Sequence, residues 1–168
     1  PRACAETELN YFPAATSLRI AVVGAGPAGL ACATVAADRG HAVTLFDAAA
    51  EIGGQFNLAR RIPGKEEFNE TLRYFRQRLG ETGVDVRLST PVAASDLAGF
   101  DTVVLATGVV PRAVDFPGCD HPKVVGYIDV LEGRAVPGER VAIIGAGGIG
   151  FDVAEFLTGD GVDDVQAK

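Results

Sequence analysis

The stretch Arg19-Ile-Ala-Val-Val-Gly-Ala-Gly-Pro-Ala-Gly29 decides the fold of this chain. Ile20 to Val23 is a short apolar run with an isoleucine and two valines, which is typical of a parallel strand that is covered on both faces. Three glycines follow with the spacing G-x-G-x-x-G, at positions Gly24, Gly26 and Gly29. We therefore predict a buried strand that runs straight into the N-terminus of a helix.

Each glycine of this loop has a physical role in binding a pyrophosphate. Gly24 allows a tight turn, Gly26 lets the backbone approach the pyrophosphate, and Gly29 lets the helix pack closely on the strand. The helix, expected from about Pro27 to Asp38, presents free N–H groups and a partial positive charge to the phosphates at its N-terminus. The loop is therefore a candidate phosphate-binding site.

An acidic residue supplies the fourth part of the pattern. Asp47 ends a second apolar run, Ala42 to Phe46, and lies about 20 residues beyond the glycines, where a carboxylate accepts hydrogen bonds from a ribose hydroxyl. A turn in a generic α/β domain would explain the glycines alone. Because strand, glycines, helix and acid all occur in order, we predict a Rossmann-like α/β domain that binds a dinucleotide.

Length and composition limit the alternatives. The chain has 168 residues with 48% hydrophobic content, enough for a core, and a formal net charge of −7, which argues against nucleic acid as a partner. No apolar run approaches the roughly 18 residues of a membrane span, and the first residues lack the charged-then-apolar order of a signal peptide. We expect a cytoplasmic protein with small-molecule or protein partners and no membrane contact. A start at Pro1 indicates a fragment or a processed product.

The three cysteines argue against one kind of flavoenzyme. Cys4, Cys32 and Cys119 lie far apart and form no C-x-x-C pair, whereas a thiol-disulfide flavoenzyme needs two cysteines near its flavin. Cys32 falls in the helix after the glycine loop, where we interpret it as a small buried hydrophobe. Spacing assigns no role to Cys4 or Cys119.

A second glycine pair follows the second strand, in Glu51-Ile-Gly-Gly-Gln-Phe-Asn57. Its glycines either let the backbone approach a ligand or make a tight turn, and the residues leave both interpretations open. A helix is expected next and should end at Gly80 and Gly83. Its apolar residues repeat at helical spacing, at Phe68, Leu72, Phe75 and Leu79. Its arginines, which we interpret as a solvated face rather than an anion site, are Arg73, Arg76 and Arg78.

Two further strands are expected. Val84 to Leu88 alternates apolar and charged residues, which fits the edge of a sheet, and Asp101 to Ala106 is a continuous apolar run. The second run ends in Ala106-Thr107-Gly108, whose small residues would let the strand end lie close to a cofactor or a connecting chain. The stretch from Pro111 to Pro122, rich in proline and glycine, is the best candidate for a connection between lobes.

The opening pattern then occurs a second time. Arg140 to Ile144 is expected to be a strand, and Gly145-Ala-Gly-Gly-Ile-Gly150 supplies a second G-x-G-x-x-G that leads into a helix through about Leu157. Its three spaced glycines are Gly145, Gly147 and Gly150. Two dinucleotide sites are therefore predicted. We divide the chain into a linker or arm (1–17), an incomplete first dinucleotide domain (18–135) and the truncated beginning of a second (136–168).

Several stretches together resemble the FAD- and NADPH-binding portion of bacterial 2,4-dienoyl-CoA reductases, in the family that also contains trimethylamine dehydrogenase and related NADH:flavin oxidoreductases. The resemblance covers nearly the whole chain. Beyond the two glycine loops, it rests on Arg39-Gly-His-Ala-Val-Thr-Leu-Phe-Asp47, Gly53-Gly-Gln-Phe-Asn57, Ile62-Pro-Gly-Lys-Glu-Glu-Phe68 and His121-Pro-Lys-Val124. It implies a flavoprotein with two Rossmann-like domains, one for FAD and one for NAD(P)H.

The resemblance also implies a larger enzyme. That enzyme has a TIM barrel with FMN, then a 4Fe-4S cluster held by cysteines, then the FAD domain with an NADPH domain inserted into it. Electrons pass from NADPH through FAD, the cluster and FMN to a 2,4-dienoyl-CoA. Pro1 would lie just beyond the last cluster ligand, so we expect no metal ligand in this chain, and no catalytic acid or base. The barrel would be its missing partner.

Individual positions match cofactor-binding positions of the family. Ala28, beside Pro27, would meet the FAD pyrophosphate through its backbone, Asp47 would hold the adenosine ribose, and the backbone of Val92 would contact the adenine. Candidate residues from the later loops are Gly54, Gln55 and Lys65. Lys65 suits a diphosphate or a flavin, but an exposed lysine at a helix start explains it equally well. The residues that choose NADP over NAD fall beyond Lys168.

Overall fold

The computed structural model describes residues 4, 5, 7, 8 and 10–159. They divide into two compact units. The first contains the described residues up to Gly54 together with Thr71–Gly108, and the second contains Gln55–Glu70 together with the described residues from Val109 onward. The chain thus leaves the first unit after its second strand and returns to it within a helix.

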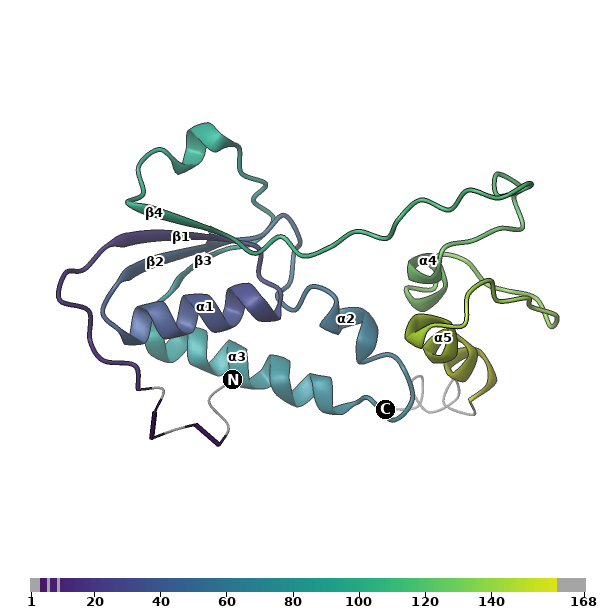
Figure 1. Cartoon of the computed structure of the whole chain (residues 1–168), viewed down its shortest axis with the longest axis horizontal. Coiled ribbons are helices and arrows are strands. Elements are labelled where there is room, and N and C mark those ends of the chain that lie inside the picture. Colours follow the sequence, from purple (N-terminus) through teal and green to yellow (C-terminus); the bar gives the residue numbers. More distant parts are fainter. Residues whose placement is uncertain (1–3, 6, 9, 160–168) are drawn as a thin grey trace. The chain divides into compact units, whose positions relative to one another are not determined.

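The first unit is built on a four-stranded parallel sheet (Figure 1). Its strands are β1 (Arg19–Val23), β2 (Ala42–Phe46), β3 (Asp85–Arg87) and β4 (Thr102–Leu105), in the spatial order β3-β2-β1-β4. This is the strand order of one half of a Rossmann fold, in which β1 lies between β2 and β4. The Rossmann-like α/β fold predicted from the glycine loop is confirmed.

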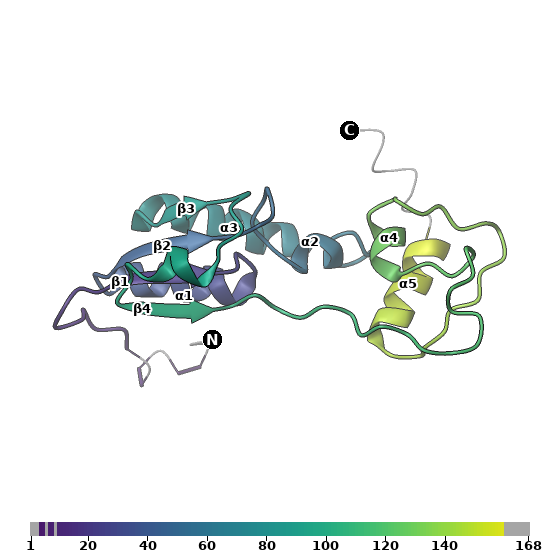
Figure 2. The ribbon, with the colours of Figure 1, turned by 90° about the horizontal axis from the view of Figure 1, so that it is seen from above.

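Two helices cover one face of this sheet, as Figures 1 and 2 show: α1 (Pro27–Asp38) and α3 (Glu67–Thr82). Most of α3 belongs to the first unit. Fully buried side chains of β1, α1 and β2 form the centre of the core, among them Val22, Leu30 and Leu45. The buried positions of α3, Leu72 and Leu79, belong to the predicted apolar repeat.

Arg78, one of the three arginines of α3, links α3 to α1. Its guanidinium forms ion pairs with Asp38 at the end of α1 and with Glu81 one turn along α3. The hydrogen bonds to Glu81 and Asp38 raise the pKa of Arg78. A hydrogen bond from Gln77, and then one from Arg78, lower the pKa of Glu81. Arg78 is therefore a structural contact rather than part of a free cationic face.

Several element boundaries differ from the expectations. Helix α3 runs through Gly80 and stops at Gly83, whose φ of +70° is the left-handed conformation that ends helices. Strand β4 was expected over Asp101–Ala106 and spans Thr102–Leu105; it is an edge strand, and Leu105 on it is 73% exposed. Short helical turns that periodicity does not reveal lie at Phe56–Ala59 (α2), Ala94–Leu97 (η1) and Tyr127–Leu131 (α4).

The described part of the predicted N-terminal arm is attached to the turn between α1 and β2. The backbone N–H of Ala14 donates to the carbonyl of Arg39 at 2.8 Å, and Arg39 Nε donates back to the carbonyl of Phe12 at 3.0 Å. Ser17 Oγ donates to the carbonyl of Gly40 at 2.7 Å. These bonds fix the path by which the chain enters β1.

The second unit contains α5 (Gly148–Thr158) but lacks the strand expected before it. The prediction of a strand over Arg140–Ile144 is wrong for this structure. Parallel strands form through hydrogen bonds with a neighbour, and no segment of the described residues pairs with this one. Ile144 is consequently 74% exposed. The helix expected to run through about Leu157 is present and ends one residue later.

Candidate dinucleotide-binding site

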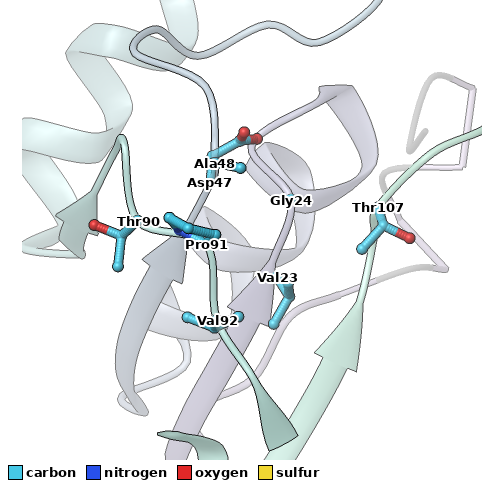
Figure 3. A pocket seen from close by; sticks show the side chains of 8 residues that line it. All are labelled: Val23, Gly24, Asp47, Ala48, Thr90, Pro91, Val92 and Thr107. Carbon is cyan, nitrogen blue, oxygen red and sulfur yellow. The ribbon is translucent and has the colours of Figure 1, made fainter.

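A pocket of about 290 Å³ opens at the carboxyl ends of the parallel strands of the first unit (Figure 3). It is lined by Val23, Gly24, Asp47, Ala48, Thr90, Pro91, Val92 and Thr107. These residues follow or end β1, β2, β3 and β4, so every strand contributes to the lining. Ligands of open α/β sheets bind at this edge, where the strand order reverses beside β1.

Asp47 connects the glycine loop after β1 to the segment after β2. The backbone N–H of Ala25, in the glycine loop, donates to Asp47 Oδ2 at 2.5 Å. The backbone N–H of Ala49 donates to Asp47 Oδ1 at 2.8 Å. Each carboxylate oxygen can accept a further bond. Asp47 therefore holds the glycine loop in place and still offers acceptor capacity toward the pocket.

The first glycine of the loop is required by its own backbone. Gly24 has a φ of +109°, and a Cβ built there would collide with the carbonyl oxygen of Ala106, which follows β4. The third glycine is required by close packing, because a Cβ on Gly29 would collide with the carbonyl oxygen of Gly24. These positions have the roles that the sequence predicted for them, and they place Ala106 against the loop.

The second glycine has no such structural requirement. Gly26 has a φ of −73° and a ψ of 178°, which any residue adopts, and a Cβ built on it would meet nothing within 4 Å. Gly26 caps α1, whose N-terminus receives no capping hydrogen bond from a side chain of the described residues. Exposed Ala28 lies in the first turn. The backbone at Gly26 is therefore open to an approaching ligand.

The paired glycines Gly53 and Gly54 pack against this loop. The Gly53 N–H donates to the carbonyl of Ala25 at 2.8 Å, and a Cβ on Gly54 would lie 3.1 Å from the Cα of Gly26. Both glycines have positive φ angles, +122° and +53°. The sequence left open whether this pair makes a tight turn or approaches a ligand. In the structure, the pair makes a tight turn that contacts the backbone of the glycine loop.

The wall of the pocket opposite the glycine loop was only partly predicted. Val92 was a candidate, but Thr90 and Pro91 were not. Thr90 N–H donates to the carbonyl of Asp47 at 2.8 Å, and its hydroxyl donates to the carbonyl of Leu88 at 2.9 Å. These bonds hold the segment after β3 against the end of β2. Pro91 beside the candidate Val92 was the only sequence signal for this wall.

The second glycine loop has the same local geometry as the first. Gly145 has a φ of +117°, and a Cβ on Gly150 would collide with the Gly145 carbonyl oxygen. Gly147 caps α5 with a φ of −88°, and a Cβ built on it would meet nothing within 4 Å. The second unit therefore contains a matching loop, although no strand precedes it among the described residues.

Other candidate residues do not line the pocket. Gln55 Nε2 donates to the carbonyl of Val109 at 3.0 Å, and Lys65 Nζ forms an ion pair of 2.6 Å with Asp152 on α5. Both residues belong to the second unit. Gly108, beyond Thr107, has a φ of +73° and ends the described first unit.

The cysteines form no redox pair. Cys4, Cys32 and Cys119, which all lie among the described residues, form no disulfide with one another. Cys32 packs against the core from α1, and burial raises the pKa of its thiol. A raised pKa lowers the thiolate fraction and hence the reactivity. Cys32 was expected to be a small buried hydrophobe; it packs against the core but is only partly buried.

Family comparison decides the class of the protein. The sequence model of the pyridine nucleotide-disulphide oxidoreductase family matches residues 18–166. The chain belongs to this family. The match spans both glycine loops. This oxidoreductase domain is therefore of the type that is built on two dinucleotide-binding folds.

Curated relatives of the oxidoreductase domain are much longer proteins. The metal reductase of Desulforamulus reducens is 34% identical over 165 residues, which cover 95% of this chain and 25% of the relative. The N,N-dimethylglycine/sarcosine dehydrogenase of Chromohalobacter salexigens is 41% identical over 133 residues, which cover 74% of this chain and 19% of the relative. The chain thus spans about a quarter or less of their length.

Among solved structures, a 2-naphthoyl-CoA reductase complex is similar to the oxidoreductase domain with a TM-score of 0.88 and 35% sequence identity. The match covers 94% of this chain and 24% of that chain. Within the described residues, no helix has the length and apolar character needed to span a membrane. The same residues contain no cluster of three side chains suited to hold a metal ion.

Proposed function

We propose that the pocket of the first unit binds the adenosine and pyrophosphate portion of FAD. Asp47 accepts hydrogen bonds from the ribose, the backbone from Gly26 to Gly29 binds the pyrophosphate, and Val92 lies against the adenine. The observation that carries the proposal is the meeting of Asp47, Gly24 and Val92 in one pocket at the strand ends. The flavin, when bound, supplies the redox chemistry, and the protein supplies binding and orientation.

The open backbone at Gly26 supports the fit of this cofactor. Neither the φ angle nor the packing at Gly26 requires a glycine. A glycine is expected at such a position where a ligand occupies the space that a side chain would fill. The uncapped N-terminus of α1 adds unpaired N–H groups and a partial positive charge, which favour a pyrophosphate. A pocket of about 290 Å³ also suits part of a dinucleotide rather than a whole one.

We propose further that the loop containing Gly145, Gly147 and Gly150 binds NAD(P)H, with NADPH as the favoured donor. Its backbone repeats the geometry of the first loop, including the open cap residue Gly147. Two such loops in one chain suit a flavoprotein in which a nicotinamide dinucleotide reduces a bound flavin. The chain then takes up electrons and passes them on, without a catalytic acid or base of its own.

The whole protein, in this proposal, is a multi-cofactor reductase of which this chain is one part. A barrel domain with FMN and a 4Fe-4S cluster are expected as partners of the described units. The substrate we favour is a 2,4-dienoyl-CoA, reduced in unsaturated fatty acid oxidation. Support comes from relatives named for the reduction of conjugated compounds, the cinnamate reductase of Clostridium sporogenes and 2-naphthoyl-CoA reductase.

Two alternatives compete with this proposal. A related oxidoreductase acting on another enone or on an amine is supported by relatives such as N,N-dimethylglycine/sarcosine dehydrogenase. A nucleotide-binding module without its own activity is the second. The colour of the purified protein distinguishes the second alternative from the proposal, because a protein with bound flavin is yellow and a nicotinamide-binding module is colourless.

The first experiment is a visible absorption spectrum of the purified full-length protein after addition of FAD and desalting. Retained flavin bands that disappear in Asp47→Ala would support the FAD site, and a folded, colourless wild type would refute it. Anaerobic addition of NADPH, or of NADH, should then bleach the bands. Comparing turnover of a 2,4-dienoyl-CoA, a cinnamate and a tertiary amine distinguishes the proposed substrate from the alternatives.

A further inference from the structure

The segment Gln55–Glu70 lies in sequence between β2 and the part of α3 that belongs to the first unit, and it includes the first turn of α3, yet it folds with the second unit. Its Ile62 is 2% exposed, and the rings of Phe56 and Phe68 pack together with centroids 4.5 Å apart and planes tilted by 46°. The segment is therefore an integral part of the second unit rather than a loose connection.

Three polar side chains of this segment reach three different parts of the second unit. Gln55 Nε2 donates to the carbonyl of Val109, which follows the first unit in sequence, at 3.0 Å. Arg61 Nη1 donates to the carbonyl at the end of α4 at 2.8 Å. Lys65 Nζ donates to Asp152 Oδ1 of α5 at 2.6 Å. Lys65 thus joins the segment to the helix of the second glycine loop.

Helix α5 has fewer buried residues than α1. Of its described residues, only Val153 is buried, at 7% exposure, whereas α1 buries four. The sheet that holds α1 in place has no counterpart beside α5, because the segment expected as a strand before it is unpaired among the described residues. Contacts of α5 include those with α4 and the ion pair of Asp152 with Lys65. A Cβ built on Gly159, which caps the end of the helix, would lie 3.3 Å from Pro63.

The position of Asp152 makes its ion pair relevant to the loop. Asp152 lies little more than one turn along α5 from Gly148, the first residue of the helix, and Gly147 caps that helix. Fixing Asp152 therefore fixes the N-terminal end of the helix, into which the glycine loop leads. The side chains of Lys65 and Asp152 are 37% and 31% exposed, so the pair is partly shielded from water and stronger than a fully solvated one.

We propose that Lys65 is a positioning residue for the second dinucleotide site, acting through Asp152 to hold α5 and its glycine loop ready for NAD(P)H. This inference rests on the proposed binding of NAD(P)H at the second loop. It differs from the role implied by the family resemblance, in which Lys65 reaches FAD. Asp152, which the sequence patterns did not single out, becomes its necessary partner.

The test uses the full-length protein with Lys65→Met, Asp152→Asn, the double variant and Lys65→Arg. NADPH affinity is measured by fluorescence titration, and FAD content is measured from the visible spectrum. Lys123→Met, a lysine change in the same unit, is the control. We expect Lys65→Met and Asp152→Asn each to weaken NADPH binding about three- to tenfold and to leave FAD content unchanged. The double variant should be no worse than either single one, because both remove the same interaction, and Lys65→Arg should retain most of the affinity.

Hydrogen exchange of the α5 amides, measured without nucleotide, provides a readout that does not depend on the proposed function. Lys65→Met and Asp152→Asn should speed exchange in α5 and leave α1 unchanged. Unaltered exchange in α5 would overturn the inference even if NADPH binds. Loss of FAD in Lys65→Met but not in Asp152→Asn would instead assign Lys65 to the first cofactor. A wild type that binds no NADPH would refute the proposed second site and this inference with it.

Discussion

The backbone N–H of Ala25 donates a hydrogen bond of 2.5 Å to the carboxylate of Asp47, so the acid at the end of β2 and the glycine loop after β1 form one unit. The second carboxylate oxygen is held by Ala49. A residue that resembles a simple ribose ligand in sequence is therefore also a structural anchor of the glycine loop. This double role shapes what its removal should do.

Replacing Asp47 by alanine should have two separable effects. FAD binding should weaken by about 1.5–3 kcal/mol, the range for hydrogen bonds to a charged group, since the ribose loses its acceptor. The apo protein should also lose about 1–2 kcal/mol of stability, because the N–H groups of Ala25 and Ala49 lose their partner. Titration with FAD and urea unfolding of apo protein measure the two effects. An unchanged FAD affinity would contradict the placement of the ribose, and Asp85→Ala on β3 is the control.

Gly24 and Gly40 offer a matched comparison of strain and packing. Both have positive φ angles, +109° and +92°, but a Cβ on Gly24 would collide with Ala106, whereas one on Gly40 would meet nothing within 4 Å. Gly40→Ala should cost about 1 kcal/mol, from strain alone, and Gly24→Ala should cost clearly more, about 2–4 kcal/mol. Urea unfolding measures both, and equal losses would show that the approach of Ala106 does not constrain the loop.

Gly26→Ala should impair cofactor binding while the protein stays folded. A Cβ there meets open space and the φ of −73° suits alanine, so the melting temperature should change little. FAD retention should fall at least tenfold if the pyrophosphate occupies that space. Full retention of FAD would mean that no ligand approaches this backbone.

Gly147→Ala is the corresponding change in the second loop. Its cap residue has the same open surroundings, with nothing within 4 Å of a built Cβ. We expect weaker NAD(P)H binding, again by about tenfold, with normal FAD content and stability. Reduction of the flavin at varied NADPH concentration measures the affinity. A loss of FAD in this variant would contradict the assignment of one nucleotide to each loop.

The interaction between Arg19 and Asp101, at the amino ends of β1 and β4, should stabilise the folded protein by an amount that depends on pH. Hydrogen bonds from the backbone N–H of Arg19, at 2.7 Å, and from its side chain lower the pKa of Asp101. A lowered pKa in the folded state means that the contribution to stability is present above the ordinary value of about 3.9 and is lost as pH falls through the folded value. Asp101→Asn should therefore lower the melting temperature at pH 7, and the difference from wild type should shrink below about pH 4.

An equal difference at every pH would show that the charge of Asp101 is unimportant. Asp115→Asn, in the stretch rich in proline and glycine that has no regular secondary structure, is the control for a nonspecific change of charge. The comparison needs thermal unfolding at several pH values in one buffer series of constant ionic strength, because exposed charges are screened by salt.

The sequence by itself was sufficient for the first βαβ unit. The bounds of β1, α1 and β2 follow from short-range features: a run of β-branched residues, glycines at fixed spacing, and Gly40 with its φ of +92° after the helix. Each of these acts within a few residues of the chain. The presence of Gly24 and Asp47 in one pocket was predictable for the same reason, since the carboxyl ends of neighbouring parallel strands lie side by side.

Tertiary structure alone decided how distant segments combine. The strand predicted over Arg140–Ile144 is absent, because an apolar run becomes a strand only when a neighbour supplies hydrogen bonds, and none of the described residues does so. Thr90 joins the pocket through bonds to Asp47 and Leu88 that no local pattern encodes. Lys65 contacts Asp152, 87 positions away, so its partner follows from the path of the chain in space. Local propensity thus determined the elements, whereas long-range hydrogen bonds and packing determined which of them meet.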